Sequence, residues 1–170
     1  MSAIAYRDAT IADAAQLAAL GADSFTQTFG HLYAPADLAL FLENHTIASW
    51  SAELSDPAFA VRVAEQDQAM IGYAKLGPPH LPFTPVTGAI ELRQLYVLGP
   101  WHGAGVAAAL MEWVIATARA RHAGELFLSV FTDNHRARRF YARHGFEEVG
   151  TYAFMVGNHA DEDIVMKLAL

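Results

Sequence analysis

The chain has 170 residues, of which 54% are hydrophobic and none is cysteine, and its formal net charge is −7. The absence of cysteine excludes disulfides, thiolate metal sites and cysteine nucleophiles, which is typical of proteins that fold in a reducing compartment. The acidic balance argues against a general nucleic-acid binder, because such proteins need a basic surface to displace counterions from phosphates. The length predicts a single domain covering residues 1–170.

The first residues, MSAIAYRDAT, contain charged side chains and no long apolar run. They predict neither a signal peptide nor a membrane span, so we expect a cytoplasmic protein with no membrane partner. The eight histidines are scattered along the chain without the spacing of metal ligands. We therefore expect no structural or catalytic metal.

The N-terminal part of the chain predicts one strand and then helices. A short strand is expected at Ile4–Arg7, and Thr10 is a plausible N-cap for a helix with apolar residues at helical spacing. A second helix is expected from Pro35 and a further short one at Ile47–Leu54. We interpret Ser24–Tyr33 as the segment between the first helices.

The pattern then changes from helical to alternating. Phe59–Glu65 and Met70–Leu76 read as the two strands of an antiparallel hairpin, with Asp67–Gln68 in the turn. The proline-rich stretch Gly77–Pro85 is too short to separate domains and is expected to be a loop between strands. A longer strand follows at Ala89–Leu98.

The C-terminal part alternates between helices and strands. Apolar residues from Val106 to about Arg121 recur at helical spacing, and Leu126–Phe131 is an apolar strand suited to the middle of a sheet. Asn134 then caps a helix that Gly145 ends. Two final antiparallel strands are expected on either side of the turn at Gly157–Asn158. This order of elements predicts a mixed α/β domain.

The glycine-rich turn before the second long helix has several interpretations. Gly103–Ala108 matches the dinucleotide fingerprint G-x-G-x-x-A, with Asp133 downstream. The match is weak, since Gly99–His102 separates the strand from the glycines and too few parallel strands follow. A phosphate-binding P-loop is excluded, because no lysine follows the second glycine. Taken alone, the glycines are also compatible with a tight turn that binds nothing.

The surrounding motifs resemble the GNAT superfamily of acyl-CoA-dependent N-acetyltransferases over roughly 71–168. The family's turn, Gln/Arg-x-x-Gly-x-Gly/Ala, falls on His102-Gly103-Ala104-Gly105-Val106-Ala107, and His102 stands where Gln or Arg is usual. A second signature, Asn-x-x-Ala-x-x-Phe-Tyr-x-x-x-Gly-Phe, is matched at Asn134, Ala137, Phe140, Tyr141, Gly145 and Phe146. The resemblance implies an α/β (α+β) fold with a mixed sheet of six to seven strands, flanked by about four helices and splayed at the fourth and fifth strands.

The resemblance also implies acetyl-CoA as cosubstrate. A helix N-terminus offers free N–H groups and positive dipole potential, and small residues let a pyrophosphate approach them. The Val97 N–H is expected to polarise the thioester carbonyl. The implied cofactor-binding residues are Leu95, Tyr96, Val97, His102, Gly103, Ala104, Gly105, Val106, Ala107, Asn134 and Phe140.

Two residues are implied to carry the chemistry. Tyr141 takes the family position of the proton donor to the departing CoA thiolate, and a helix-core aromatic is the alternative. Glu91 is the expected base, directly or through water, with an ordinary solvent-facing strand residue as the alternative. Strand alternation is expected to place Glu91, Arg93, Leu95 and Val97 on one side.

The acceptor is expected to be a primary amine of a small molecule, polyamine-like or amino-acid-like, or of a peptide. The family builds its acceptor cleft where this chain has Ser24–Tyr33, whose aromatics either line an amine pocket or pack a pair of helices. The acidic loop Asn158–Asp163 either attracts a cationic acceptor or serves solubility. A non-catalytic acyl-CoA-binding or sensing module is the alternative function. A cluster at Arg136, Arg139 and Arg143 reads either as a phosphate contact or as a solvated helix face. The sequence is compatible with a monomer or a homodimer.

Overall fold

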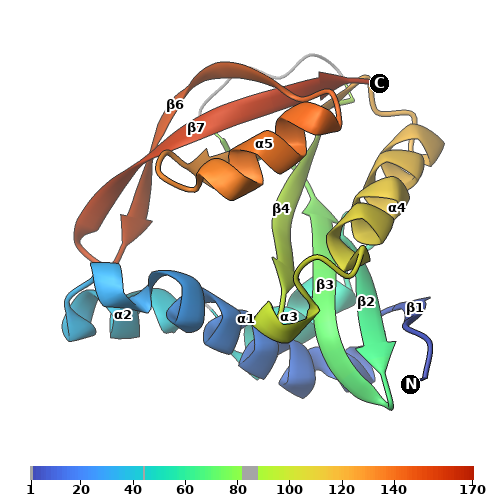
Figure 1. The fold of residues 1–170 in the computed structure, drawn as a ribbon, viewed down its shortest axis with the longest axis horizontal. Coiled ribbons are helices and arrows are strands. Elements are labelled where there is room, and N and C mark those ends of the chain that lie inside the picture. Colours follow the sequence, from blue (N-terminus) through green and yellow to red (C-terminus); the bar gives the residue numbers. More distant parts are fainter. Residues whose placement is uncertain (1, 44, 82–87) are drawn as a thin grey trace.

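The computed structural model describes residues 2–43, 45–81 and 88–170. In these residues the chain forms one seven-stranded mixed sheet with the order β1-β2-β3-β4-β5-β7-β6 (Figure 1). The strands are β1 (Ala5–Asp8), β2 (Ala60–Gln66), β3 (Ala69–Gly77), β4 (Ile90–Val97), β5 (Glu125–Phe131), β6 (Glu147–Val156) and β7 (His159–Ala169). All neighbours pair antiparallel except β4 and β5, which are parallel.

Within the described part of the chain, five α-helices accompany the sheet, one more than the four or so that the resemblance implied. They are α1 (Ala14–Phe29), α2 (Pro35–Leu42), α3 (Ile47–Leu54), α4 (Val106–Ala120) and α5 (His135–Arg143). Short 3₁₀ turns precede α1 at Ile11–Asp13, follow it at Gly30–Leu32 and follow β4 at Gly99–Trp101. The expected mixed α/β domain is confirmed.

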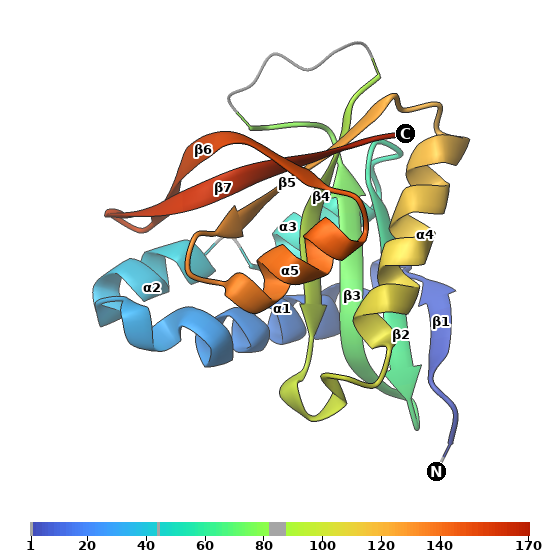
Figure 2. The same cartoon turned by 45° about the horizontal axis from the view of Figure 1, so that its top comes forward.

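The helices cover opposite faces of the sheet, as Figure 2 shows. On one face, Leu110, Met111 and Val114 of α4 pack with Leu126 and Leu128 of β5, and the aromatics of α5 join this cluster. On the other face, helices α1 and α3 pack on β2 and β3 in a second cluster that includes the buried Trp50. Burial of these apolar surfaces is the main stabilising contribution to the fold.

The sheet is splayed at its fourth and fifth strands, as expected. Only the first residues of the two strands pair, Ile90 with Leu126 and Glu91 with Phe127. Beyond these pairs β4 continues to Val97 and β5 to Phe131 without partnering each other. Backbone groups on the facing edges of the two strands are therefore available to a ligand that enters between them.

A β-bulge in β4 changes which side chains share a face. Lys75 of β3 pairs with Gln94, but the next residue, Leu76, pairs with Leu92, so Arg93 is the extra residue. A bulge of this kind shifts the alternation of a strand by one position. The expectation that the odd-numbered residues from 91 to 97 lie on one side is therefore wrong.

The two faces can be followed through the partners of β4. Leu95 and Val97 pack with Leu92 in the cluster under α4. On the opposite face, the Gln94 side chain accepts a hydrogen bond from the Tyr73 hydroxyl. Glu91 lies on that opposite face too, because it pairs with Gly77, two residues along β3 from Lys75. The carboxylate and the apolar end of the strand therefore point to opposite faces of the sheet.

Two segments expected to be loops are parts of regular elements. Helix α1 runs without interruption to Phe29, so most of Ser24–Tyr33 is helical. The aromatics of this segment pack on one another, with Phe25 5.3 Å from Phe29 between ring centroids. The acidic stretch from His159 onwards belongs to β7 and pairs with β6. In Gly77–Pro85, Gly77 is the last residue of β3, and residues 82–85 lie outside the described residues.

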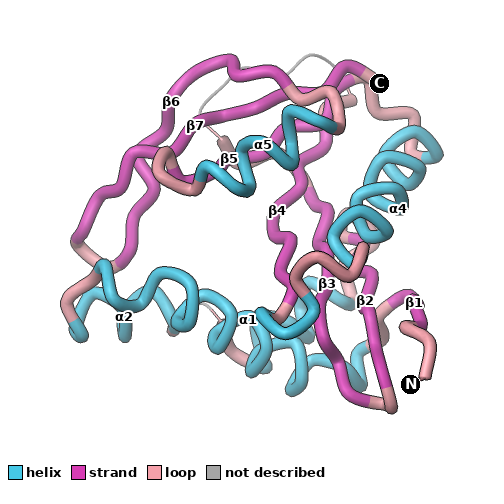
Figure 3. Tube along the Cα trace, in the orientation of Figure 1, coloured by secondary structure: helices cyan, strands magenta, loops and turns pink. Residues whose placement is uncertain are grey.

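The β6–β7 hairpin reaches across to α2 (Figure 3). Phe41 of α2 packs on Phe154 of β6 at 5.6 Å between ring centroids, and the Asn158 N–H donates to Asp37 Oδ1 at 2.9 Å. Gly157 lies so close to this helix that an added Cβ would stand 2.5 Å from the Asp37 Cα. This contact joins the end of the sheet to the N-terminal helices.

Candidate active site

The glycine turn between β4 and α4 opens onto a cavity that we call the turn cavity. Gly103 and Gly105 have φ angles of +83° and +82°, and beyond the adjacent residues no described atom lies within 4 Å of an ideal Cβ at either position. Gly105 is the N-cap residue of α4, so the first N–H groups of this helix face the open space. The cavity is lined by Thr28, Leu95, Val97, Trp101, His102, Gly103, Gly105, Val106, Ala107, Ala108, Asn134, Arg136, Ala137, Phe140, Tyr141 and Arg143.

A pyrophosphate fits this arrangement. The free amides and the helix dipole together attract an anion, and the missing side chains leave room for it to reach them. An alanine at position 103 or 105 would put its Cβ into the cradle and strain the backbone, because L-residues rarely adopt these angles. The open space at the two glycines is therefore compatible with a phosphate-binding turn.

His102 connects the turn to α5. Its Nε2 lies 2.7 Å from the Val97 carbonyl oxygen, and its Nδ1 lies 2.7 Å from Nη1 of Arg136. A carbonyl only accepts and a guanidinium only donates, so the contacts require a neutral imidazole with its proton on Nε2. The Arg136 guanidinium is therefore held at the edge of the turn cavity. Of the three arginines left open by the sequence, Arg136 and Arg143 line the cavity and Arg139 does not.

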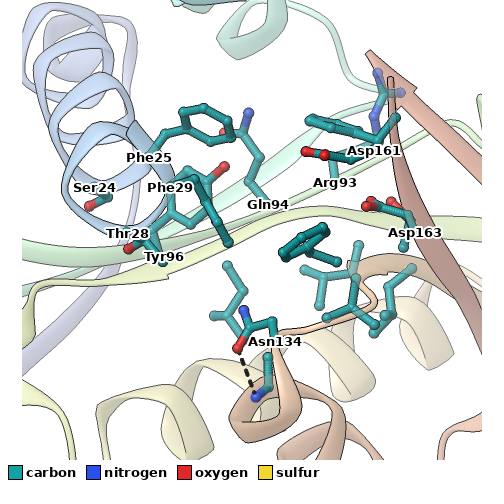
Figure 4. A pocket seen from close by; sticks show the side chains of 18 of the residues that line it. Ser24, Phe25, Thr28, Phe29, Arg93, Gln94, Tyr96, Asn134, Asp161 and Asp163 are labelled. Carbon is teal, nitrogen blue, oxygen red and sulfur yellow. Dashed lines mark hydrogen bonds between the residues drawn. The ribbon is translucent and has the colours of Figure 1, made fainter. Parts of the chain in front are cut away.

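A second cavity, which we call the splay cavity, lies where β4 and β5 diverge (Figure 4). Helix α1 forms one wall and β7 the opposite one. The lining residues are Ser24, Phe25, Thr28, Phe29, Tyr33, Leu92, Arg93, Gln94, Leu95, Tyr96, Val97, Leu128, Ser129, Val130, Phe131, Asn134, Ala137, Tyr141, Phe154, Asp161 and Asp163. The two cavities share Thr28, Leu95, Val97, Asn134, Ala137 and Tyr141, so they meet at the splay.

Tyr141 lies at this junction. Its ring packs edge-on to Phe140 at 5.5 Å and to Phe146 at 5.9 Å between centroids. It also lines both cavities, so a core position and a position beside a ligand are compatible. Burial raises the pKa of the Tyr141 phenol to about 12, which keeps its proton in place at neutral pH.

Asn134 holds the start of α5 at the same junction. Its side-chain oxygen accepts a hydrogen bond from the Ala137 N–H at 3.3 Å, as the sequence predicted for the cap. Because the oxygen is used in the cap, the side-chain NH₂ remains as a donor toward the cavities. The capping interaction thus fixes the asparagine in the position where it lines both of them.

The carboxylate of Glu91 lies in a different environment. Its side chain is 2% exposed, so the interpretation as a solvent-facing residue is wrong. Oε1 accepts from the His80 N–H at 3.1 Å, and Oε2 lies 2.6 Å from His80 Nδ1 and 3.4 Å from Arg93 Nε. Glu91 is not among the residues that line the two cavities, whereas Arg93 lines the splay cavity. Its role as a base stays a prediction.

Other predicted residues divide between the cavities. Tyr96 lines only the splay cavity, where burial, with the nearby Tyr141 and Asp163, raises its pKa. Ala104 is not among the lining residues of either cavity. Leu95 and Val97 line both. The Leu98 N–H donates to the Ile71 carbonyl of β3 at 2.9 Å, so alternation directs the Val97 N–H away from β3, toward the splay.

The sequence predicted an acidic loop at Asn158–Asp163 but not that two of its carboxylates form a wall of the splay cavity. Asp161 and Asp163 were assigned to a loop, but both are residues of β7 that line the cavity (Figure 4). Asp161 accepts from the Tyr33 hydroxyl at Oδ2, and its Oδ1 lies 3.0 Å from His159 Nε2. The spacing of the two aspartates, with Val165 next in the series, is the strand period that would have placed them on one face.

Two further observations concern the described residues as a set. No helix among them has the length and apolarity needed to span a bilayer. They also contain no group of three or more histidine, aspartate or glutamate side chains arranged to hold a metal ion.

Comparisons with known proteins agree with the geometry. Residues 21–146 match the model of the acetyltransferase (GNAT) family. An uncharacterized N-acetyltransferase of Mycobacterium tuberculosis is 39% identical over 158 residues, which cover 91% of this chain and 96% of the relative. One from Lactobacillus delbrueckii subsp. lactis is 27% identical over 161 residues, covering 93% and 92%.

Solved structures give the same fold. The PaiA N-acetyltransferase of Thermoplasma acidophilum, in complex with coenzyme A, has a TM-score of 0.79 at 18% identity and covers 99% of this chain and 100% of its own. The ribosomal-protein-alanine N-acetyltransferase of Brucella melitensis has a TM-score of 0.75 at 27% identity, covering 98% and 99%. From the family match, the identity to its relatives and the shared fold, this chain belongs to the GNAT family of N-acetyltransferases.

Proposed function

We propose that the protein transfers the acetyl group of acetyl-CoA to the primary amine of a small molecule, polyamine-like or amino-acid-like, or of a peptide. The observation that carries this proposal is the meeting of the turn cavity and the splay cavity along six shared lining residues. One substrate can enter from each side and reach the other at the splay. Direct attack within a ternary complex then needs no covalent enzyme intermediate.

The turn cavity is proposed to hold coenzyme A. The pyrophosphate binds at the N-terminus of α4, between Gly103 and Gly105, with Arg136 at its edge. The pantetheine arm then follows the free edge of β4 toward Val97. Coenzyme A bound to PaiA of Thermoplasma acidophilum, and acetyl-CoA bound to YncA of Salmonella typhimurium, are consistent with this use of the fold.

The transfer step follows from the groups at the junction. The amine nitrogen attacks the thioester carbonyl carbon, and the Val97 N–H stabilises the oxyanion that develops. The tetrahedral intermediate collapses as the carbon–sulfur bond breaks, and Tyr141 donates a hydrogen bond to the departing thiolate. The products are the N-acetyl amine and free coenzyme A. The family resemblance implies Glu91 as the base, and this assignment is tested below against a second carboxylate.

The proposal is tested by incubating the protein with acetyl-CoA and a panel of amines while free coenzyme A is measured with a thiol reagent. The panel contains polyamines, amino acids, arylalkylamines and peptides with free N-termini. Release of coenzyme A that depends on one class of amine, with the N-acetyl product seen by mass spectrometry, is the expected result. Tight binding of acetyl-CoA without release for every amine would instead favour the sensing module.

A further inference from the structure

The wall of the splay cavity formed by β7 carries a buried carboxylate that the proposed transfer does not yet use. Asp163 is 6% exposed and lines the cavity, and its backbone pairs with Phe131 at the end of β5. We propose that Asp163 accepts the proton of a cationic primary amine bound in the splay cavity, and that this cavity selects amines carried on an apolar or aromatic chain. The inference rests on the proposed acetyl transfer and names its acceptor class and proton acceptor.

Asp163 differs from its neighbour Asp161 in how it is bound. Both oxygens of Asp161 are occupied, one by the Tyr33 hydroxyl and the other by His159. Asp163 has Ser129 as its hydrogen-bonding neighbour and no cationic side chain in contact with it among the described residues. A buried carboxylate without a positive partner is costly, and an incoming ammonium group removes that cost.

The charged and titratable groups facing Asp163 come from all sides of the cavity. Asp161 lies on the same strand, Tyr33 follows α1, and Arg93 and Tyr96 belong to β4. Tyr141 of α5 closes the side toward the turn cavity. The guanidinium of Arg93 is held by the Pro78 carbonyl at 2.8 Å and by Glu91. The tyrosines stay neutral because burial raises their pKa values.

Burial raises the pKa of Asp163 to about 7, Ser129 opposes the rise by hydrogen bonding, and Asp161 adds to it. A base with a pKa near the working pH is suited to proton transfer. This carboxyl is therefore ionised above neutrality and ready to accept a proton, and it returns that proton to solvent after each turnover.

The aromatic wall of the splay cavity, across from Asp163, explains why we expect an amine that is carried on an apolar chain. Phe25 and Phe29 of α1 line the cavity (Figure 4), and Tyr33, which follows α1, and Phe154 of β6 line it as well. Aromatic rings next to carboxylates bind an ammonium group and the carbon chain behind it. The Ser24 hydroxyl on this wall is 7% exposed as a residue and has no hydrogen-bond partner among the described residues, so it is free to bind a polar group of the acceptor.

The protons balance in this scheme. The ammonium form has three protons on nitrogen and the amide product has one. Asp163 takes the first proton before attack, which leaves a neutral amine whose lone pair forms the new carbon–nitrogen bond. The second proton leaves the nitrogen after attack and ends on the coenzyme A thiolate, so the sum is N-acetyl amine, coenzyme A thiol and one proton released to solvent.

The test uses 2-phenylethylamine as the probe and compares wild type with Asp163→Asn and Glu91→Gln. In wild type, kcat/KM for the amine should rise with pH through about 7 and then level. Asp163→Asn should lower kcat/KM at pH 7.5 by about 10²- to 10⁴-fold, the range for loss of a general base, and move the rise toward the pKa of the amine itself. Glu91→Gln tests the rival base: the rise stays near 7 in this variant when Asp163 is the proton acceptor, even where Glu91→Gln lowers kcat.

A readout without turnover checks the carboxyl directly. The folded-state pKa of Asp163 is raised above the unfolded value, so its protonation stabilises the fold most at low pH and this contribution is lost as the pH rises through about 7. The melting temperature of wild type should therefore fall, relative to that of Asp163→Asn, between pH 5 and pH 8. Identical profiles would overturn the assignment.

The remaining outcomes separate this inference from the proposed function. Loss of the rise in Glu91→Gln but not in Asp163→Asn would assign the proton to Glu91 and overturn the inference. Turnover of other amines but not of 2-phenylethylamine would overturn the acceptor class while leaving acetyl transfer intact. Failure of every amine would defeat the proposed function. The inference about Asp163 would then be tested by calorimetry of 2-phenylethylamine binding to the coenzyme A complex. If Asp163→Asn does not weaken that binding, the inference is overturned too.

Discussion

Replacing Tyr141 by phenylalanine removes one hydroxyl from the junction of the two cavities and leaves the ring packing on Phe140 and Phe146 in place. The change tests what the hydroxyl does during the transfer. A tyrosine can give its proton fully to the thiolate, or it can only donate a hydrogen bond to it. These two roles differ in the size of the effect and in the pH profile.

The environment of the phenol decides between them. Its pKa of about 12 exceeds that of an ordinary thiol, about 8.5, by roughly 3.5 units, so full proton transfer is uphill by about 5 kcal/mol. A hydrogen bond to a charged group contributes about 1.5–3 kcal/mol. We therefore expect Tyr141→Phe to lower kcat by about 10- to 150-fold, because 1.36 kcal/mol corresponds to a factor of ten.

The assay is coenzyme A release at saturating amine, with KM for acetyl-CoA measured in parallel. KM should stay within about threefold of wild type, since the thiolate exists only late in the reaction. Tyr6→Phe, on β1 and outside both cavities, is the matched control. An unchanged kcat would refute a role in the transfer. A loss well above 10³-fold would show that the proton itself is transferred, contrary to the reasoning from the pKa.

Two further predictions concern the turn cavity. Gly105→Ala should weaken coenzyme A binding by at least about tenfold in calorimetry, because the left-handed conformation costs an L-residue about 1–2 kcal/mol and the added Cβ enters the phosphate-binding turn. Gly124→Ala, also at an open glycine but outside both cavities, should bind coenzyme A as wild type does. Equal affinities for the two variants would contradict binding of the pyrophosphate at this turn. His102→Ala should weaken coenzyme A binding about 2- to 10-fold, because it releases the Arg136 side chain. The double variant with Arg136→Ala should lose less affinity than the two single effects combined. Full additivity would show that the two side chains act separately.

The parts of the site that the sequence predicted depend on short stretches of chain. The glycines of the turn need only their own backbone angles, and the Asn134 cap is satisfied by a residue three positions away. The relation of Tyr141 to Asn134 is set by the period of one helix. Local rules of this kind can be read directly from residue order.

The errors arose where distant segments decide the outcome. The bulge at Arg93 results from the register with β3, which no pattern within β4 reveals, and it turned Glu91 away from the face of Leu95. The aspartates of β7 became cavity residues because β7 pairs with β5 and faces α1 across the splay. Such placements require the tertiary structure, since they join segments that are separate in the sequence, by up to 128 positions in the contact between Tyr33 and Asp161.

The division of the site between two cavities has a consequence for how the protein can change over evolution. The residues that line only the splay cavity include members of α1, β4, β5, β6 and β7, whereas the glycine turn and Arg136 and Arg143 of α5 line only the turn cavity. With the proposed occupants of the two cavities, a substitution at Phe25 or Phe154 alters which amine is accepted without altering the affinity for coenzyme A. New acceptor specificities are thus open to selection through single substitutions, and a library restricted to the α1 and β6 positions would be an efficient starting point for redesign.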